Sequence, residues 1–384
     1  MYIYIIMELT PSKIQEKIEE HLPVKTKEKN QFGEVFTPPE LIDEMLDKLP
    51  ISIWKNPNLK WLDPANGIGN YPMKVFERLN KGLSSVKGYE NNEKRKKHII
   101  NNMLYMIELN FKNIEVSKKI FGEDANIYCG SFLEDGWNNV FKIDKFDVII
   151  GNPPYNNHAV GNKGEKQLDK KFINKSLDLL NKNGYLLFIT KTYWRGQVNT
   201  DIHKKLKQMT LLFLKTYDFK TNPFKENVLV NYFLIKNNNN NKKETNFYYN
   251  DISNNGYIID DMNIYSLNRD YFIYLNKLKK KYGNLEHITR SSKIIAKEYL
   301  LIPHSLTINR KINISNKKPD SDKYYIIPNP NNLTKQFFNS HIFLDLLNIG
   351  KFTGFTTSKD LFKDIPNFNN IDEKEHSKII KKLI

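Results

Sequence analysis

The chain has 384 residues, 40% of them hydrophobic, with a formal net charge of +16 and a single cysteine. This length suggests two domains, or three small ones, with a substantial core, while one cysteine excludes a disulfide framework and a metal site built on thiolates. No stretch approaches the roughly 20 apolar residues of a membrane span. The opening MYIYIIM is too short for a signal core, so we expect a cytoplasmic protein with no membrane partner.

Two explanations remain open for the positive charge. It fits a polyanionic partner such as nucleic acid. However, the basic residues are nearly all lysine, and asparagine, isoleucine, tyrosine and phenylalanine are also abundant, which is the pattern of a host or viral genome rich in AT pairs. Codon bias alone raises lysine content, so the charge favours nucleic acid only weakly.

In chain order, residues 1–30 have the pattern of a polar helical extension, and apolar runs then alternate with amphipathic helical patterns from residue 31 to 236. We expect strands at 59–63, 86–90, 126–130, 146–150, 185–190, 211–217 and 228–236, and helices at 71–79, 93–107 and 166–180. This alternation predicts a mostly parallel sheet with helices on both faces, an α/β fold. Cys129 is expected as a buried thiol in the third strand, in a reducing compartment.

The composition changes after the last of these strands. Residues 237–243 form a run of asparagines and lysines, a low-complexity pattern typical of a linker. Residues 244–384 have weaker periodicity, several Asn-Pro turns and scattered aromatics. We therefore expect 31–236 to form one domain and 244–384 a separate, irregular α+β domain.

Residues suited to binding a ligand follow three of the expected strands. The first strand runs into LDPANGIGN, where Gly67 and Gly69 let the backbone approach a ligand closely. The second ends at Glu90, whose carboxylate could accept both hydroxyls of a ribose, and the third runs into Phe132, which could pack on an adenine ring. An ordinary surface glutamate and a core phenylalanine are the alternatives. Together the strand ends indicate one nucleotide-binding crevice, because the carboxyl ends of parallel strands meet at one edge.

The fourth strand ends in a stiff corner, Gly151-Asn152-Pro153-Pro154-Tyr155. Two consecutive prolines have a fixed φ and no N–H, so they end both sheet pairing and helix. The corner holds out the amide oxygen of Asn152 and the carbonyl of Pro153, two fixed acceptors suited to gripping a planar NH2 group. The ring of Tyr155 offers a stacking surface worth about 1–3 kcal/mol per base. The alternative is an ordinary strand followed by a turn.

In their order along the chain, FGEVFTPPELIDEML, LDPANGIGN, GYE, GSF, NPPY and GYLLFITKTYW resemble the motifs of gamma-class N6-adenine-specific DNA methyltransferases of restriction–modification systems. The resemblance covers residues 31–236. It implies the Rossmann-like sheet of a class I methyltransferase dependent on S-adenosyl-L-methionine (SAM). It further implies double-stranded DNA as substrate, a C-terminal domain that recognises the target sequence, and a cognate restriction endonuclease as the partner to look for.

The resemblance also assigns roles to single residues. It places the cofactor against Thr37, Pro38, Asp63, Asn66, Gly67, Gly69, Glu90, Ser131 and Phe132, with Thr37 and Pro38 at the methionine end and Glu90 on the ribose. Ser131 departs from the pattern, because many relatives have an acidic residue there. The catalytic corner would be Asn152, Pro153, Pro154 and Tyr155. Phe224 would be a second aromatic against the target base, although a core phenylalanine is as good an interpretation.

Three other interpretations stay open. A corner of this kind also occurs in enzymes that methylate glutamine in translation release factors, although those chains usually end soon after the last strand and lack FTPP. RNA adenine is another acceptor. An inactive SAM-fold subunit that only binds DNA is the non-enzymatic alternative, and the intact glycines, Glu90 and NPPY argue against it. In the C-terminal half, Arg290 and Arg310 are candidates for contacts with phosphates or base edges.

Overall fold

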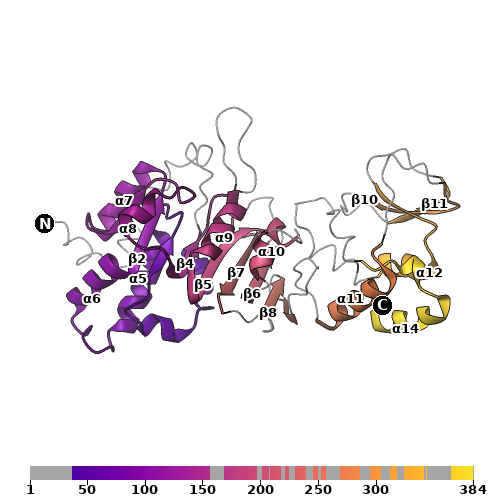
Figure 1. Cartoon of the computed structure of the whole chain (residues 1–384), viewed down its shortest axis with the longest axis horizontal. Coiled ribbons are helices and arrows are strands. Elements are labelled where there is room, and N and C mark those ends of the chain that lie inside the picture. Colours follow the sequence, from indigo (N-terminus) through magenta and orange to yellow (C-terminus); the bar gives the residue numbers. More distant parts are fainter. Residues whose placement is uncertain are drawn as a thin grey trace.

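The computed structural model describes residues 37–155, 168–196, 201–206, 208–217, 221–224, 230–238, 245–249, 252–256, 269–285, 295–303, 312–317, 324–340, 343 and 365–383. These residues form a nine-stranded sheet with helices on both faces and a smaller C-terminal unit (Figure 1). Within the described ranges, no helix is both long enough and apolar enough to cross a membrane.

The large sheet contains β1 (Trp61–Asp63), β2 (Leu104–Glu108), β3 (Asn126–Cys129), β4 (Phe146–Gly151), β5 (Leu180–Lys191), β6 (Thr210–Tyr217), β7 (Val230–Lys236), β8 (Thr245–Tyr249) and β9 (Ile252–Gly256). Their order across the sheet is β3-β2-β1-β4-β5-β7-β6-β8-β9. The first five strands pair in parallel, whereas β7 runs antiparallel between β5 and β6. The predicted α/β fold with a mostly parallel sheet is therefore confirmed.

Helices cover both faces of this sheet because successive strand residues point to opposite sides. Trp61 and Val148 belong to the core under α4 (Pro39–Leu46), α5 (Asn70–Leu83) and α7 (Phe111–Phe121). Their neighbours Leu62 and Ile149 belong to the opposite core, under α8 (Gly136–Phe141), α9 (Leu168–Asp178) and α10 (Asp201–Leu206). The strands are thus buried on both sides, which leaves their carboxyl ends as the edge where a site can form.

The strand expected at 86–90 is wrong, and the second strand is β2 instead. Residues 86–90 form turns, in which Gly88 has a φ of 89°. The carbonyls of Tyr89 and Glu90 accept hydrogen bonds from the guanidinium of Arg95 at 2.8 and 3.0 Å, so they serve a turn rather than a strand ladder.

The helix expected over 93–107 is correspondingly too long. It divides into α6 (Asn92–His98), the π-helical turn η3 (Ile99–Met103) and β2. The side-chain amide of Asn126 on the neighbouring strand β3 donates to the carbonyls of Asn101 and Leu104 at 2.9 and 3.0 Å. These carbonyls are thereby satisfied where the helix ends, so the chain can turn directly into a strand.

Two further expectations need correction at the margins of the sheet. Cys129 does lie in β3, but its side chain is exposed, because β3 forms one edge of the sheet.

At the opposite margin, the sheet continues beyond the boundary expected at 237–243. Strand β8 pairs in parallel with β6, and the hydroxyl of Thr245 donates to the carbonyl of Leu211 at 2.6 Å.

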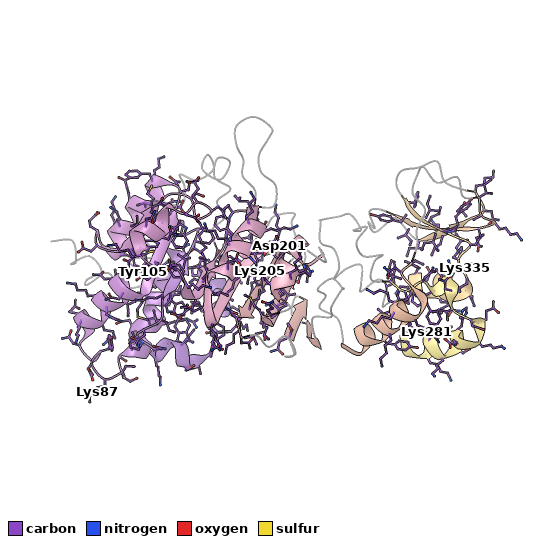
Figure 2. The ribbon with its side chains drawn as sticks, in the orientation of Figure 1. Lys87, Tyr105, Asp201, Lys205, Lys281 and Lys335 are labelled. Carbon is purple, nitrogen blue, oxygen red and sulfur yellow. The ribbon has the colours of Figure 1, made fainter. Side chains whose placement is uncertain are left out.

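The C-terminal unit has its own core and an α+β architecture. It comprises α11 (Arg269–Tyr282), β10 (Tyr299–Pro303), β11 (Asn313–Ser315), β12 (Tyr324–Pro328), α12 (Asn332–Phe338), the short turn η6 (Phe368–Asn370) and α14 (Glu373–Leu383). Leu300, Ile327 and Phe337 are at most 1% exposed in its core. Lys281 and Lys335, labelled in Figure 2, both form ion pairs with glutamates of this unit. Arg290, Arg310 and the extension at 1–30 lie outside the described residues.

Candidate active site

The loop after β1 is shaped by two glycines in the left-handed region. Gly67 has a φ of 57°, and a Cβ built there would have no atom within 4 Å. Gly69 has a φ of 97° at the start of α5, and its Cβ would lie 2.8 Å from the ring of Phe121. Gly69 is therefore required by conformation and by packing, whereas Gly67 keeps the backbone open to an approaching ligand.

The carboxylate of Glu108, at the end of β2, holds this loop. One of its oxygens accepts the N–H of Gly67 at 2.7 Å, and the other accepts the N–H of Asn110 at 2.7 Å. Glu90 instead lies on an exposed turn, where it accepts the N–H of Gly88 at 2.9 Å. The structure thus contradicts the placement of Glu90 at the end of the second strand, and Glu108 holds that position.

A signal for Glu108 is present in the sequence. It closes the apolar run LYMIE, and Asn110, two residues later, caps α7 by accepting the N–H of Lys112 at 3.1 Å. A strand that ends in an acidic residue followed by a helix cap is the arrangement expected at a ribose site. The helical spacing of the isoleucines and methionines before it obscures this signal.

Asp63 is a buried acid at the end of β1. Its side chain is 2% exposed, and one carboxylate oxygen accepts the N–H of Ala65 at 3.1 Å. Burial, together with the nearby charge of Glu108, raises the pKa of Asp63 to about 8. Within the described residues, its second oxygen has no hydrogen-bond partner, and neither has the amide oxygen of Asn66. The loop therefore offers buried acceptors suited to a cationic or N–H-bearing ligand.

The corner after β4 presses against this loop. Gly151 has a φ of 148°, and a Cβ there would lie 2.8 Å from a carboxylate oxygen of Asp63. Next to it, the side-chain nitrogen of Asn152 donates to the hydroxyl of Thr37 at 3.2 Å. The structure therefore brings together Thr37, Asp63 and Asn152, which the sequence analysis assigned to one site.

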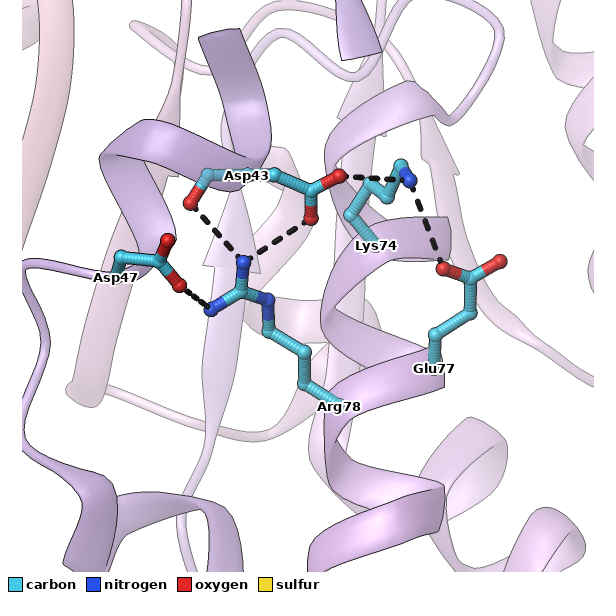
Figure 3. A network of polar contacts seen from close by, with 5 residues as sticks. All are labelled: Asp43, Asp47, Lys74, Glu77 and Arg78. Atoms are coloured by element: carbon cyan, nitrogen blue, oxygen red, sulfur yellow. Dashed lines mark hydrogen bonds and ion pairs between the residues drawn. The ribbon is translucent and has the colours of Figure 1, made fainter. Parts of the chain in front are cut away.

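Helix α4, which follows Thr37 and Pro38, is pinned on two sides. Toward α5, Arg78 bonds the carboxylates of Asp43 and Asp47 at 3.0 and 2.6 Å, and Lys74 pairs with Asp43 at 2.9 Å (Figure 3). Partial burial opposes ionisation of Asp43, yet its hydrogen bonds with Lys74 and Arg78 hold its pKa below the usual value. The start of α4 is thus fixed relative to the core of the sheet.

Toward the sheet, Glu44 of α4 accepts hydrogen bonds from Lys215 on β6 and from the hydroxyl of Tyr232 on β7, each at 2.8 Å. Partial burial again works to raise the pKa of this carboxyl, but these two bonds leave it lowered. The segment that carries Thr37 is therefore anchored to β7, which pairs with β5, and to β6 on the far side of β7.

The aromatic residues assigned to the site are more covered than expected. Tyr155 is 8% exposed within the core, and the ammonium of Lys191 lies 5.6 Å from its ring centroid. Phe224 is half-buried against the same core. The stacking roles of both rings stay predictions.

Phe132 and Ser131 follow β3. Phe132 is 1% exposed, and its ring centroid lies 5.1 Å from that of Phe172 and 6.1 Å from that of Trp137. The core-phenylalanine alternative therefore describes this ring in the structure. The hydroxyl of Ser131 accepts the N–H of Leu133 at 3.2 Å, so it shapes the turn. Contact of either residue with an adenine ring stays a prediction.

Two apolar side chains that the sequence analysis missed lie beside Glu108. Leu109 is 61% exposed and Phe111 is 63% exposed, directly after the end of β2. Apolar groups next to a hydrogen-bonding carboxylate form a surface that suits the flat face of a nucleoside base. They add an exposed hydrophobic element beside Glu108, at the end of β2.

Part of the chain is similar in sequence to known methylases. Residues 76–224 match the family model of the Eco57I restriction-modification methylase. An uncharacterized adenine-specific methylase of Mycoplasma pneumoniae is 28% identical, over 42% of this chain and 55% of its own. Modification methylase CviBIII of Paramecium bursaria Chlorella virus NC1A is also 28% identical, over 43% of this chain and 39% of its own. The chain thus spans about half the length of the curated relatives it matches.

One solved structure resembles the fold of this chain over nearly its whole length. The Type IIL restriction-modification enzyme MmeI, in complex with DNA, superposes with a TM-score of 0.51 and 14% sequence identity, over 97% of this chain and 69% of its own. At this level of identity the likeness concerns the fold alone. Together with the strand order, it supports the α/β fold with a mostly parallel sheet.

Proposed function

We propose that this protein, a restriction-modification methylase of the Eco57I type over residues 76–224, transfers a methyl group from SAM to the N6 amine of adenine in double-stranded DNA. Both relatives are named as methylases, and the one from Mycoplasma pneumoniae is named as adenine-specific, which supports this activity. The observation that carries the proposal is the contact of the Asn152 corner with Thr37 and with the buried carboxylate of Asp63.

The residues around the β1 loop fit SAM. Glu108 stands where a ribose diol would be accepted, and Leu109 offers an exposed apolar surface next to it. The buried free oxygen of Asp63, unpartnered within the described residues, suits the ammonium group of a methionine moiety, and Gly67 leaves open space for close approach. When bound, SAM supplies a methyl group already activated by its sulfonium centre.

The corner around Asn152 explains why an adenine amine would be the methyl acceptor. The adenine amine is a weak nucleophile because its lone pair is delocalised into the ring. The amide oxygen of Asn152 and the carbonyl of Pro153 would each accept one N–H and turn the lone pair toward the methyl group. Asn152 has no basic function near neutral pH, and none is needed before attack, because the amine proton becomes acidic once the methyl group is attached. Positioning is therefore the main contribution of these residues.

The substrate base has to leave the duplex to reach this corner, which costs a few kcal/mol. We propose the C-terminal unit, residues 269–383 where described, as the part that recognises the DNA sequence. Its separate core and lysine-bearing surface support this role. A cognate restriction endonuclease remains the partner to look for.

The test is a transfer assay with labelled SAM offered to duplex DNA, RNA and a translation release factor in parallel. We expect label on adenine N6 of the DNA, detected by nucleoside analysis. Label only on the release factor, or only on RNA, would refute the proposal. As a second arm, Asn152→Ala should lower transfer to background while SAM binding, measured by calorimetry, persists.

A further inference from the structure

Four side chains from three segments, three of them buried, form one hydrogen-bonded chain that ends at the partly buried Asn152 of the corner. The side-chain nitrogen of Asn152 lies 3.2 Å from the hydroxyl oxygen of Thr37, which is hydrogen-bonded to the hydroxyl of Tyr71 on α5. The hydroxyl of Tyr71 donates in turn to the sulfur of Met45 on α4, at 3.4 Å. Thr37, Tyr71 and Met45 are 4%, 5% and 0% exposed, so the chain runs through the protein interior.

The sulfur of Met45 gives this chain a direction. A thioether has no proton and can only accept. Tyr71 therefore donates its proton to Met45, and its oxygen is left to accept from Thr37. Burial raises the pKa of Tyr71, so the phenol keeps the proton that this arrangement uses. With its own proton committed to Tyr71, the oxygen of Thr37 can only accept from Asn152.

Direction matters because the two ends of an asparagine amide have nearly the same shape. Packing alone does not distinguish the nitrogen from the oxygen, so the hydrogen-bond network decides the orientation. If the amide of Asn152 were reversed, its NH2 group would face the NH2 group of the substrate. Two donors would then oppose each other, and the corner could not draw the amine hydrogens out of the ring plane.

We propose that Met45 and Tyr71 are positioning residues, which use the one-way chain through Thr37 to keep the oxygen of Asn152 turned toward the target amine. The inference rests on the proposed function and deepens it. Neither residue touches the substrate in this scheme. Each acts only through the orientation of the next member of the chain.

The framework around these residues is rigid enough for such a role. Met45 lies in α4 between Asp43 and Asp47, both of which bond Arg78 of α5 (Figure 3). On α5, Tyr71 lies one and two turns before Lys74 and Arg78, on the same face of the helix. The ion pairs therefore hold α4 against α5 at the point where Met45 and Tyr71 meet.

The test compares kcat, KM for DNA and SAM affinity in Met45→Leu, Tyr71→Phe and the double variant. Tyr71→Phe frees the hydroxyl of Thr37 to donate to the oxygen of Asn152, so kcat should fall about tenfold, equivalent to one hydrogen bond. Met45→Leu conserves volume and removes only the terminal acceptor, so kcat should fall about threefold. The KM and the SAM affinity should stay within about twofold of wild type, because binding contacts are untouched.

Met103→Leu is the matched control, since Met103 is 0% exposed in the same core. It should leave kcat unchanged. The double variant should be no slower than Tyr71→Phe alone, because both changes act through one chain. An equal fall in kcat in Met45→Leu and Met103→Leu would overturn the inference. So would a fall in kcat in the double variant that equals the product of the two single falls. A wild-type protein that methylates no DNA would instead refute the proposed function itself.

Discussion

At the scale of single residues, Glu108, which holds the β1 loop, shows which site residues the sequence predicts and which it does not. The glycines, Asn152 and Thr37 are recognisable from their motifs, and the structure brings them together. Glu90 and Glu108 both follow apolar residues and both precede a helix cap, so composition alone does not separate them. What separates them is pairing with β1 and β3, a long-range property.

Substituting each of these two acids by glutamine tests which of them is the ribose ligand. We expect Glu108→Gln to weaken SAM binding about 10- to 100-fold, because an amide has one acceptor for the two N–H groups that the carboxylate serves. Glu90→Gln should bind SAM as the wild type does, since Glu90 lies on an exposed turn. Isothermal titration calorimetry gives both values, and the reverse ranking would restore Glu90 as the ribose ligand.

The buried acid Asp63 makes stability depend on pH. Its pKa is about 8 in the folded protein against 3.8 ordinarily, so the folded state holds this proton more tightly than the unfolded chain does. Its contribution to stability is complete below pH 3.8 and is lost as the pH rises toward 8.

Relative to wild type, Asp63→Asn should therefore gain little stability at pH 4 and on the order of a few kcal/mol at pH 8, while binding SAM less tightly. Denaturant unfolding at several pH values without SAM measures the first effect. A stability difference that does not change with pH would contradict this prediction.

At the scale of elements, the sequence predicts strands and helices well where one pattern dominates. The strands at 126–130, 146–150 and 211–217 and the helix at 166–180 are all close to their observed bounds. The prediction fails at 93–107, where helical spacing continues through Ile99 and Met103 into β2. The helix ends there because Asn126, about 25 residues later, satisfies its last carbonyls, and a local pattern cannot show that contact.

The ion pairs between α4 and α5 should contribute to the unfolding free energy, and this contribution should depend on the salt concentration. Arg78→Gln leaves the carboxylates of Asp43 and Asp47 without their shared cation, so the unfolding free energy should fall by about 1 kcal/mol at low salt. The loss should shrink in 1 M NaCl because the pairs are partly exposed. Lys204→Gln is the control, since its pair with Asp201 is 67% and 71% exposed and should contribute almost nothing. Equal losses in the two variants would contradict a special role for the α4–α5 contact.

At the scale of the whole molecule, the sequence predicts two units but not the boundary between them. The asparagine run suggests an end to the sheet near residue 237, whereas β8 and β9 extend it to Gly256. A chain that ends at residue 256 should therefore unfold cooperatively and bind SAM. A chain that ends at 238 exposes the edge of β6 and should aggregate. Size-exclusion chromatography and thermal unfolding compare them, and identical behaviour would show that β8 and β9 are dispensable.

The exposed position of Cys129 has a practical consequence. It is the one thiol of the sequence, and it pairs in register with Glu108 on the adjacent strand. The backbone to which a maleimide dye would be attached lies about 5 Å, one strand spacing, from the backbone of Glu108, which holds the β1 loop. The native protein could thus be labelled at a single defined thiol, and dye fluorescence could be used to follow ligand binding next to Glu108 without any engineered handle.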